Sequence, residues 1–258
     1  MKTPATVAVV IANWNGRSWL QQCLPTLAAQ TFKDFSIIVV DNGSTDGSTT
    51  WLAENWPEVK LLPQKKNLGF ATANNIGIRA TKSPFVVLLN NDTLVDPGWL
   101  EALLTAVSEP DVGMAASCIV RWNQPDQLDS AGIVVDKAGI AWNRGWGQPA
   151  TLASKPCFVF GPSAAAALYR RDMLDDIGLF DEDYFAYYED VDLAWRAQRA
   201  GWHCRYTPDA RVRHWHSATA LKTPNYKNFL NGRNKIWTIL KNYDWPALLW
   251  ASPVIIAY

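Results

Sequence analysis

The stretch PFVVLLNNDT at residues 84–93 indicates what kind of fold to expect. Its first part is almost wholly apolar, and a short apolar run predicts a strand that is buried on both faces. The run then ends on Asn90, Asn91 and Asp92. A buried strand does not usually finish on three polar side chains, because burying them without partners costs free energy. We therefore expect a polar ligand beyond the end of this strand.

Similar apolar runs recur along the first half of the chain and alternate with segments of helical spacing. The expected strands cover residues 6–14, 35–41, 59–64, 84–90 and 112–120, and the expected helices cover 18–30, 48–56, 70–81 and 98–109. Asp96 and Pro97 suit an N-cap and a first helical position, so the last of these helices is expected to begin there. Continuous apolar strands separated by helices predict an α/β fold with a parallel sheet covered on both faces.

The pattern changes after about residue 120. Glycines punctuate short β-like pieces up to about residue 156, which predicts a β-ribbon. Helical spacing returns at residues 170–178 and 187–201. No repeat or low-complexity linker interrupts the chain, so we expect one domain over residues 1–245. Its two halves would be a nucleotide-binding half of about 1–120 and an acceptor-side half of about 121–245.

Composition excludes some classes of protein. The chain has 24 basic and 24 acidic residues among 258, so its formal charge is zero. Without a basic excess, nucleic acid is not an expected partner. The four cysteines lie far apart with no CxxC pair, which is typical of reduced thiols in a cytoplasmic protein.

The C-terminal segment PALLWASPVIIAY, residues 246–258, carries no charge. It is shorter than the roughly 18–20 apolar residues that span a bilayer. The segment can pack on the domain, lie in a membrane interface at the inner face of the plasma membrane, or begin a longer hydrophobic stretch. The sequence leaves these three interpretations open, and two of them bring the protein to a membrane.

Polar clusters follow four of the expected strands. They are residues 12–15, 41–44, 66–67 and 90–92. Ligands of open α/β sheets bind beyond the carboxyl ends of the strands, where these clusters would lie. Any one cluster alone is better explained as a turn, because Asn, Asp and Gly favour turns. Four polar strand ends together favour a binding site.

Five blocks of sequence occur in a specific order over residues 6–245. They are VVDNGSTDGS (39–48), NLGFATANNIGIRA (67–80), LLNNDT (88–93), GLFDEDYFAYYEDVDLAWRAQRAG (178–201) and ARVRHWH (210–216). Together they resemble the inverting glycosyltransferases of family 2, in particular the bacterial rhamnosyltransferase-like branch. The resemblance implies a GT-A fold, a nucleotide-sugar donor, a divalent metal, and transfer with inversion to an acceptor hydroxyl.

The family's D-x-D metal motif corresponds to Asn90, Asn91 and Asp92. Only Asp92 is a carboxylate, so we expect it to be the direct ligand of Mn²⁺ or Mg²⁺, and a single carboxylate should weaken metal binding. Asn90 can accept a ribose hydroxyl or reach a metal-bound water. The alternative is that Asp92 caps a turn. The resemblance also implies His214 as a metal ligand, which suits Mn²⁺ better than Mg²⁺, and His216 is a weaker candidate.

The last expected helix offers three carboxylates for the general base that inverting transfer requires. Asp192 shares a helix face with Arg196 and Arg199, which predicts a surface ion-pair partner. Asp190 lies on an inward face of small and apolar residues and matches the family's catalytic aspartate. Glu189 is the less favoured base and is expected to orient Asp190 or to meet the acceptor. The alternative for Asp190 is simple N-capping.

The donor is expected to be a UDP- or dTDP-sugar, for example of rhamnose or galactose. The expected nucleotide contacts are Ala12, Asn13, Asn15, Asp41, Asn67, Gly69, Asn90, Asn91 and Arg233. Asp41 matches the family's base-reading aspartate, and its carboxylate can accept the N3–H of uracil or thymine. Gly69 would let the backbone approach the nucleotide closely. The resemblance implies that Arg233 contacts the diphosphate from a loop.

The acceptor is expected to be a glycan or a lipid-linked saccharide. Trp122, Trp142 and Trp146 on the ribbon can stack on sugar faces, although each alone is better explained by packing. Residues 161–164 are expected to form a wall near the transferred sugar.

Other functions fit the sequence less well. A sugar nucleotidyltransferase would need a glycine-rich loop ending in Arg and Lys after the first strand, and ANWNGRSW (residues 12–19) lacks it. The same segment lacks the G-x-G-x-x-G of a dinucleotide oxidoreductase. A glycan-binding module that has lost its chemistry remains an alternative, because the metal motif has only one carboxylate.

Overall fold

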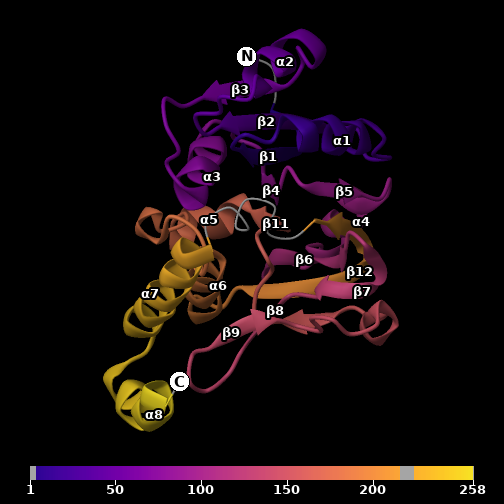
Figure 1. Ribbon diagram of the computed structural model, residues 1–258. Coiled ribbons are helices and arrows are strands. Elements are labelled where there is room, and N and C mark those ends of the chain that lie inside the picture. The colour runs from indigo at the N-terminus through magenta and orange to yellow at the C-terminus, as the bar shows by residue number, and fades with distance from the viewer. Residues whose placement is uncertain (1–3, 216–223, 258) are drawn as a thin grey trace.

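A computed structural model gives the structure over residues 4–215 and 224–257 (Figure 1). Within these residues, ten strands form one sheet, and two more pair as a separate hairpin. The strands are β1 (Val7–Asn13), β2 (Phe35–Asp41), β3 (Lys60–Pro63), β4 (Phe85–Leu89), β5 (Thr93–Val95), β6 (Val112–Arg121), β7 (Gln124–Ser130), β8 (Ile133–Val135), β9 (Ala141–Asn143), β10 (Cys157–Val159), β11 (Ala166–Arg170) and β12 (His203–His214). His216 lies outside the described residues.

The sheet is mixed, with the strand order β10-β12-β6-β11-β4-β1-β2-β3, and β5 and β7 pair with β12 and β6. Strands β4, β1, β2 and β3 are parallel, as predicted. β11, which the sequence analysis did not predict, lies between β4 and β6 and is antiparallel to both. The sheet is therefore mixed, although the five predicted strands run in the same direction.

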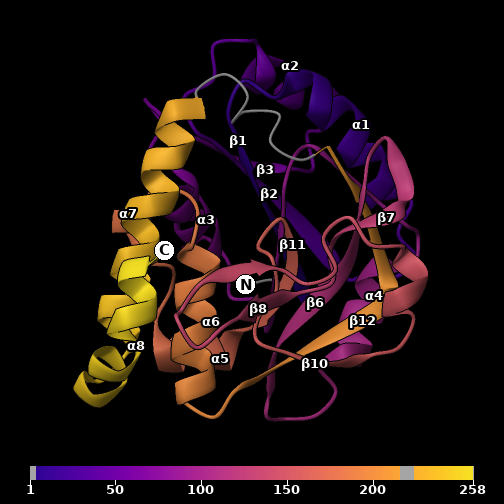
Figure 2. The same cartoon turned by 60° about the horizontal axis from the view of Figure 1, so that its bottom comes forward.

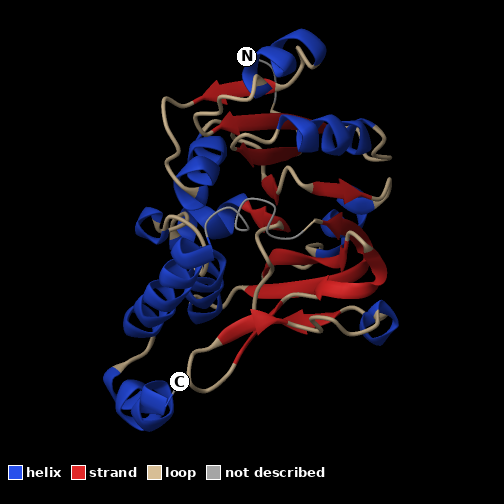
Figure 3. Cartoon of the chain, viewed as in Figure 1, coloured by secondary structure: helices blue, strands red, loops and turns tan. Residues whose placement is uncertain are grey.

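Helices cover both faces of the sheet (Figure 3). They are α1 (Arg17–Ala28), α2 (Ser48–Asn55), α3 (Phe70–Arg79), α4 (Trp99–Ala106), α5 (Arg171–Ile177), α6 (Glu189–Arg199), α7 (Pro224–Asn242) and α8 (Trp245–Ala257). Val7, Val9 and Ile11 of β1 share a core with α1, α2 and α4, whereas Ala8 and Val10 share one with α3, α5 and α6. Because both faces of β1 are buried, its sequence is continuously apolar.

The predicted start of α4 is wrong by about two residues. The helix begins at Trp99, and Gly98 occupies the N-cap position without a side-chain hydrogen bond. Asp96 is held outside the helix because its backbone N–H donates to the carbonyl of Arg211. Trp99 is fully buried, and its indole N–H donates to the Ser117 hydroxyl at 2.9 Å. The sheet therefore decides where this helix begins, not the capping residue types.

The second half contains the predicted ribbon, built from β7 and the antiparallel β8–β9 pair. It continues through α5, α6 and β12 to α7, which packs against α6. Figure 2 shows α7 and α8 along one side of the molecule. Among the described helices, none is both long enough and apolar enough to cross a membrane.

Candidate active site

A cleft of about 710 Å³ lies beyond the carboxyl ends of β1 and β4 and is closed from the other side by α6, α7 and the ribbon. Ten of the predicted site residues line it: Ala12, Asn13, Asn67, Gly69, Asn90, Asn91, Asp92, Glu189, Asp190 and His214. The first seven belong to the first half of the chain, and the last three to the second half. Residues about 100 positions apart in sequence therefore face one cavity.

Asn15, Asp41 and Arg233 are absent from the cleft lining. Asp41 is buried, and its carboxylate accepts hydrogen bonds from the Asn13 side chain and the Ser44 backbone, both at 2.9 Å. The Asn15 side chain accepts from the Thr45 backbone N–H at 2.7 Å. In the structure, Asp41 and Asn15 thus organise the loops after β1 and β2.

Asp92 and His214 lie next to each other at the bottom of the cleft. His214 ends β12, which pairs with β5 just after Asp92, and this pairing brings the two residues together. The Asp92 carboxylate is 3.3 Å from His214 Nε2, and the Asp129 carboxylate is 2.6 Å from His214 Nδ1. Asp129 was not predicted, because nothing in the sequence of β7 distinguishes it from an ordinary ribbon residue.

The two carboxylates change the acidity of His214. Burial alone would lower its pKa, but the hydrogen bonds with Asp129 and Asp92 outweigh burial and raise the pKa to about 9. Asp129 also fixes which ring nitrogen faces the cleft, as carboxylate partners of metal-binding histidines commonly do. His214 therefore presents Nε2 toward Asp92.

The donor atoms around Asp92 fit a divalent metal. Adjacent ligands on an octahedral ion with bonds of about 2.1 Å lie roughly 3 Å apart, close to the 3.3 Å between the Asp92 and His214 atoms. The Asn90 amide is 3.4 Å from the same His214 nitrogen. Among the described residues, no group of three His, Cys, Asp or Glu side chains converges to hold an ion. Asp92 and His214 could therefore hold a metal only with further oxygen ligands.

The remaining Asn of the motif joins two strand ends. The Asn91 amide donates to the Asn13 side-chain oxygen at 2.7 Å, and Asn13 in turn donates to Asp41. A Cβ at Gly16 would lie 2.1 Å from the Asn91 amide nitrogen, so only glycine leaves room for this contact. The ends of β1, β2 and β4 are thus held by one polar network.

Asp190 lies in the first turn of α6, on the opposite wall of the cleft. Its carboxylate accepts from the backbone N–H of Ala164 at 3.1 Å and of Val191 at 2.9 Å. Burial raises the pKa of Asp190 above its usual range, and these hydrogen bonds counteract part of the rise. A carboxylate with a raised pKa is a stronger base.

Glu189 precedes Asp190 and is more deeply buried. Its Oε2 atom has no hydrogen-bond partner among the described residues. Burial, and secondarily the charge of Asp190, raise the pKa of Glu189 well above its usual range. The two neighbouring carboxyl groups therefore differ in how readily each loses its proton.

The prediction that Asp192 is a surface residue is wrong. Asp192 is fully buried, although it does pair with Arg196 at 2.9 Å as predicted. Lys241 of α7 is its second partner at 3.1 Å, whereas Arg199 donates to the Asn242 carbonyl instead. Helical spacing identified the partner on the same helix, but α7 covers this face.

The backbone leading into α6 is strained. Phe185, Tyr187 and Tyr188 have φ angles of 64°, 70° and 68°. Such left-handed conformations in residues other than glycine cost on the order of 1–3 kcal/mol each. A Cβ at Gly69 would lie 2.6 Å from the Phe185 carbonyl oxygen, so Gly69 is required for this loop to pack.

Arg233 contacts this strained loop and not the cleft. It lies within α7, and its guanidinium donates to the carbonyls of Asp183 and Tyr184, each at 3.0 Å. It also stacks 4.3 Å from the Trp237 ring. The described residues that line the cleft include one Lys or Arg, which is Lys227 at the start of α7.

The three predicted ribbon tryptophans have different surroundings. Trp142 is half-exposed and lines the cleft. Trp122 packs in a cluster with Trp19 and Trp215, and Trp146 lies under the Arg121 guanidinium. Of the predicted wall at residues 161–164, Ser163 and Ala164 line the cleft.

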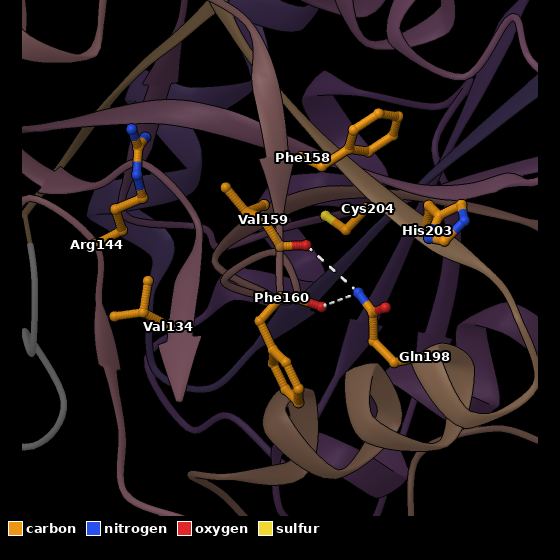
Figure 4. A pocket seen from close by; sticks show the side chains of 8 residues that line it. All are labelled: Val134, Arg144, Phe158, Val159, Phe160, Gln198, His203 and Cys204. Atoms are coloured by element: carbon orange, nitrogen blue, oxygen red, sulfur yellow. Dashed lines mark hydrogen bonds between the residues drawn. The ribbon is translucent and has the colours of Figure 1, made fainter. Parts of the chain in front are cut away.

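A second, open cavity of about 480 Å³ lies between the ribbon and α6 (Figure 4). Val159 and Phe160 present carbonyls there to the Gln198 amide, at 3.4 and 2.9 Å. It shares no lining residue with the cleft that holds Asp92 and Asp190.

The chain is similar to known glycosyltransferases in sequence. The model of "Glycosyl transferase family 2" matches residues 8–178. An N-acetylglucosaminyl-diphospho-decaprenol L-rhamnosyltransferase from Mycobacterium tuberculosis is 28% identical over 253 residues, covering 84% of this chain and 78% of that protein. A pre-mycofactocin glycosyltransferase from the same organism is 31% identical over 212 residues, covering 81% of this chain and 43% of that protein.

Solved structures are similar in fold. GalNAc-T7 with UDP, GalNAc and Mn²⁺ has a TM-score of 0.71 at 15% identity, covering 93% of this chain and 48% of that one. A mannosyltransferase from Pyrobaculum calidifontis in complex with GDP-Man and Mn²⁺ has a TM-score of 0.62 at 17% identity, covering 100% and 82%. The family model covers more than half of the chain and agrees with both likenesses. The chain therefore belongs to glycosyl transferase family 2 and is a glycosyltransferase with the GT-A fold.

Proposed function

We propose that this glycosyltransferase moves a sugar from a UDP- or dTDP-sugar to a hydroxyl of a glycan or lipid-linked saccharide, with inversion and with Mn²⁺ or Mg²⁺. One observation carries the proposal: the Asp92–His214 pair and Asp190 line the same cleft, although Asp92 comes from the first half of the chain and Asp190 and His214 come from the second. The similarity to a rhamnosyltransferase favours a deoxysugar such as rhamnose as the transferred group.

In the proposed reaction, Asp190 accepts the proton of the acceptor hydroxyl while that oxygen bonds to the anomeric carbon. The bond from the same carbon to the diphosphate oxygen breaks on the opposite face, and the nucleoside diphosphate leaves with the electron pair. The Ala164 N–H orients the Asp190 carboxylate toward the cleft. A divalent ion held by Asp92 and His214 would neutralise charge on the leaving diphosphate.

The donor contacts divide between the two walls. We assign the nucleotide to the wall formed by Ala12, Asn13, Asn67 and Gly69, because these residues line the cleft at the end of β1 and before the start of α3. Direct reading of a uracil or thymine N3–H by Asp41 would require its carboxylate to become accessible from the cleft, because Asp41 is buried and does not line the cleft. Lys227, not Arg233, is the proposed diphosphate contact, because it is the cationic side chain of α7 that lines the cleft.

The proposed catalytic domain comprises residues 1–245, with a nucleotide-binding half of about 1–120 and an acceptor-side half of about 121–245. One continuous sheet containing strands of both halves supports a single domain. We further propose that the segment 246–258 touches a membrane at its cytoplasmic face, near a lipid-linked acceptor. Leu249 and Trp250 of this segment, and Trp245 just before it, support this by exposing 74%, 66% and 79% of their surface.

The test pairs ligand binding with turnover. UDP- and dTDP-sugars are screened by thermal shift with and without Mn²⁺, because a ligand that binds the folded state raises the melting temperature. The best donor is then given to wild type and to Asp190→Asn, and release of nucleoside diphosphate is measured. We expect Asp190→Asn to keep the fold and the metal-dependent shift while turnover disappears. Near-normal turnover in Asp190→Asn would refute the base assignment, and binding without turnover in wild type would favour a glycan-binding module.

A further inference from the structure

We propose that Asn234 is a positioning residue that holds residues 184–188 in their strained conformation and thereby sets the position of Asp190. The inference rests on the function proposed above, because Asp190 is the base only in that reaction. The carrying observation is that one buried side chain on α7 bonds to three carbonyls of the segment that leads into α6.

The segment has an unusual backbone. Phe185, Tyr187 and Tyr188 all have positive φ angles, and they make up three of the four such non-glycine residues in the described chain. Tyr188 is the N-cap residue of α6, so Asp190 follows it by two positions. A strained segment relaxes unless its surroundings hold it, and a change at Tyr188 would redirect the first turn of α6.

Asn234 supplies that hold. Its side-chain nitrogen lies 2.9 Å from the Tyr184 carbonyl oxygen, 2.8 Å from that of Ala186 and 2.7 Å from that of Tyr187. The side chain is completely buried, and its oxygen accepts from Arg233 Nε at 2.9 Å. The Asn234 amide has two N–H hydrogens for three carbonyl oxygens, so two of the oxygens share one hydrogen. The three carbonyls therefore lie close together around the Asn234 nitrogen.

A second anchor prevents the segment from moving as a unit. The Phe185 carbonyl accepts from the backbone N–H groups of Phe70 and Ala71, at 2.6 and 3.2 Å, at the start of α3. The loop is therefore fixed between α3 and α7. Without Asn234, Arg233 still holds the Asp183 and Tyr184 carbonyls, but Ala186 and Tyr187 lose their bonds to α7, and the expected motion would carry the start of α6 and Asp190 away from Ala164.

Donor binding should be affected much less than chemistry. Asp92 lies on the loop after β4 and His214 at the end of β12, whereas residues 184–188 are held by α3 and α7. A misplaced base lowers the rate of the chemical step, and a displacement of about 1 Å can cost roughly 100-fold. Residues 185–188 also line the cleft, so loss of Asn234 is expected to lower kcat by a larger factor than it lowers the affinity for the nucleotide sugar.

The experiment compares Asn234→Ala with the matched control Asn75→Ala. Asn75 is also a fully buried helical asparagine bonded to a loop, since it donates to the Phe180 carbonyl at 2.8 Å and accepts from the Phe180 N–H at 3.1 Å. Phe180 precedes the strained segment and has no positive φ. We expect both variants to melt at lower temperature, but only Asn234→Ala to lose about 10- to 100-fold in kcat, with a smaller loss of donor affinity.

Hydrogen exchange gives a second readout that does not depend on activity. Amides of residues 184–190 should exchange faster in Asn234→Ala than in Asn75→Ala. If Asn234→Ala does not fold, Arg233→Ala replaces it, because it removes the bonds to the Asp183 and Tyr184 carbonyls and to Asn234. Its expected effects have the same direction and a smaller size. If the Asn234 or Arg233 variant has the same kcat and the same hydrogen exchange as Asn75→Ala, the positioning role of Asn234 is wrong. If wild type itself transfers no sugar, the proposed function is wrong instead.

Discussion

Glu189 and Asp190 are neighbours in the first turn of α6, yet they have different surroundings. Asp190 receives two backbone N–H groups, which favour its charged form, whereas the Oε2 atom of Glu189 is buried without a partner among the described residues. Both pKa values are raised by burial, that of Glu189 further because Asp190 is beside it. Asp190 therefore loses its proton first as the pH rises, and Glu189 keeps its own longer.

This difference predicts how Glu189→Gln changes stability. A carboxyl group whose pKa is raised by folding binds its proton more tightly in the native state. Its contribution is fully present below the unfolded value of about 4.3 and is lost as the pH rises through the folded value. Glutamine does not titrate, so the free energy of unfolding should fall less between about pH 5 and pH 8 in Glu189→Gln than in wild type. Urea unfolding at both pH values measures this, with exposed Glu54→Gln as control, and parallel declines would contradict it.

The raised pKa of His214 leads us to predict that metal binding releases a proton. The His214 pKa of about 9 means that the imidazole is charged at neutral pH, and an imidazole must lose that proton before it can bind a metal. Between about pH 6 and pH 8 the affinity for Mn²⁺ should therefore rise about tenfold per pH unit. Titration calorimetry in two buffers of different ionisation enthalpy counts the released protons. Asp129→Asn should reduce that number, because it removes a partner that raises the pKa, and a pH-independent affinity would exclude His214 as ligand.

At the scale of elements, the end of β12 is held by a tryptophan cluster, formed by Trp19, Trp122 and Trp215. The ring centroids of Trp19 and Trp215 are 5.0 Å apart, and those of Trp122 and Trp215 are 5.5 Å apart. The backbone N–H of Trp215 donates to the Asp92 carbonyl at 3.0 Å, and the backbone N–H of Trp122 donates to the His214 carbonyl at 2.9 Å. The cluster thus fixes the backbone of both proposed metal ligands.

Trp215→Ala should therefore weaken metal binding. The side chain touches neither proposed ligand atom, but its loss frees the backbone that carries them. Residues that orient metal ligands typically contribute 10- to 100-fold in affinity, and we expect about tenfold weaker Mn²⁺ binding. Calorimetric titration with Mn²⁺ measures it, and Trp146→Ala, a partly exposed tryptophan outside the cluster, is the control. Equal Mn²⁺ affinity in the two variants would show that the cluster has no such role.

At the scale of the whole molecule, α7 and α8 form one side of the protein (Figure 2). The start of α7 lines the cleft, and α8 follows with Leu249 and Trp250 largely exposed. Lys137 of the ribbon lies 5.8 Å from the Trp250 ring centroid. Exposed tryptophan beside a basic residue is typical of surfaces that meet lipid headgroups.

We therefore predict that the protein binds phospholipid vesicles through α8. The double variant Leu249→Glu with Trp250→Glu should cosediment with anionic vesicles several-fold less than wild type, because a charged side chain resists burial among lipid tails. Leu152→Glu, at a residue 70% exposed on the ribbon side, is the matched control. Donor hydrolysis should be unchanged in both. Equal vesicle binding by the double variant and wild type would assign α8 to another partner.

Much of the first half of the fold could be predicted from sequence. Apart from the short strand β5, the strands and helices up to β6 lie close to their expected positions, because buried parallel strands have continuous apolar runs and the helices between them have a regular spacing. The start of α4 and the strands β5 and β11 were not predicted. They depend on pairing with strands that lie far away in the chain: β5 and Asp96 contact β12, and β11 pairs with β4 and β6.

The sequence alone determined the α/β class, the polar ends of the strands and the resemblance that pointed to Asp92, Asp190 and His214. Each of these follows either from the types of residues that lie close together in the sequence or from the order of motifs along it, and both can be read without the structure. Only the tertiary structure brought Asp129 to His214, Asn234 to the loop before Asp190, and Arg233 away from the cleft. Side-chain contacts between residues so distant along the chain depend on strand pairing and helix packing, and no local pattern records them.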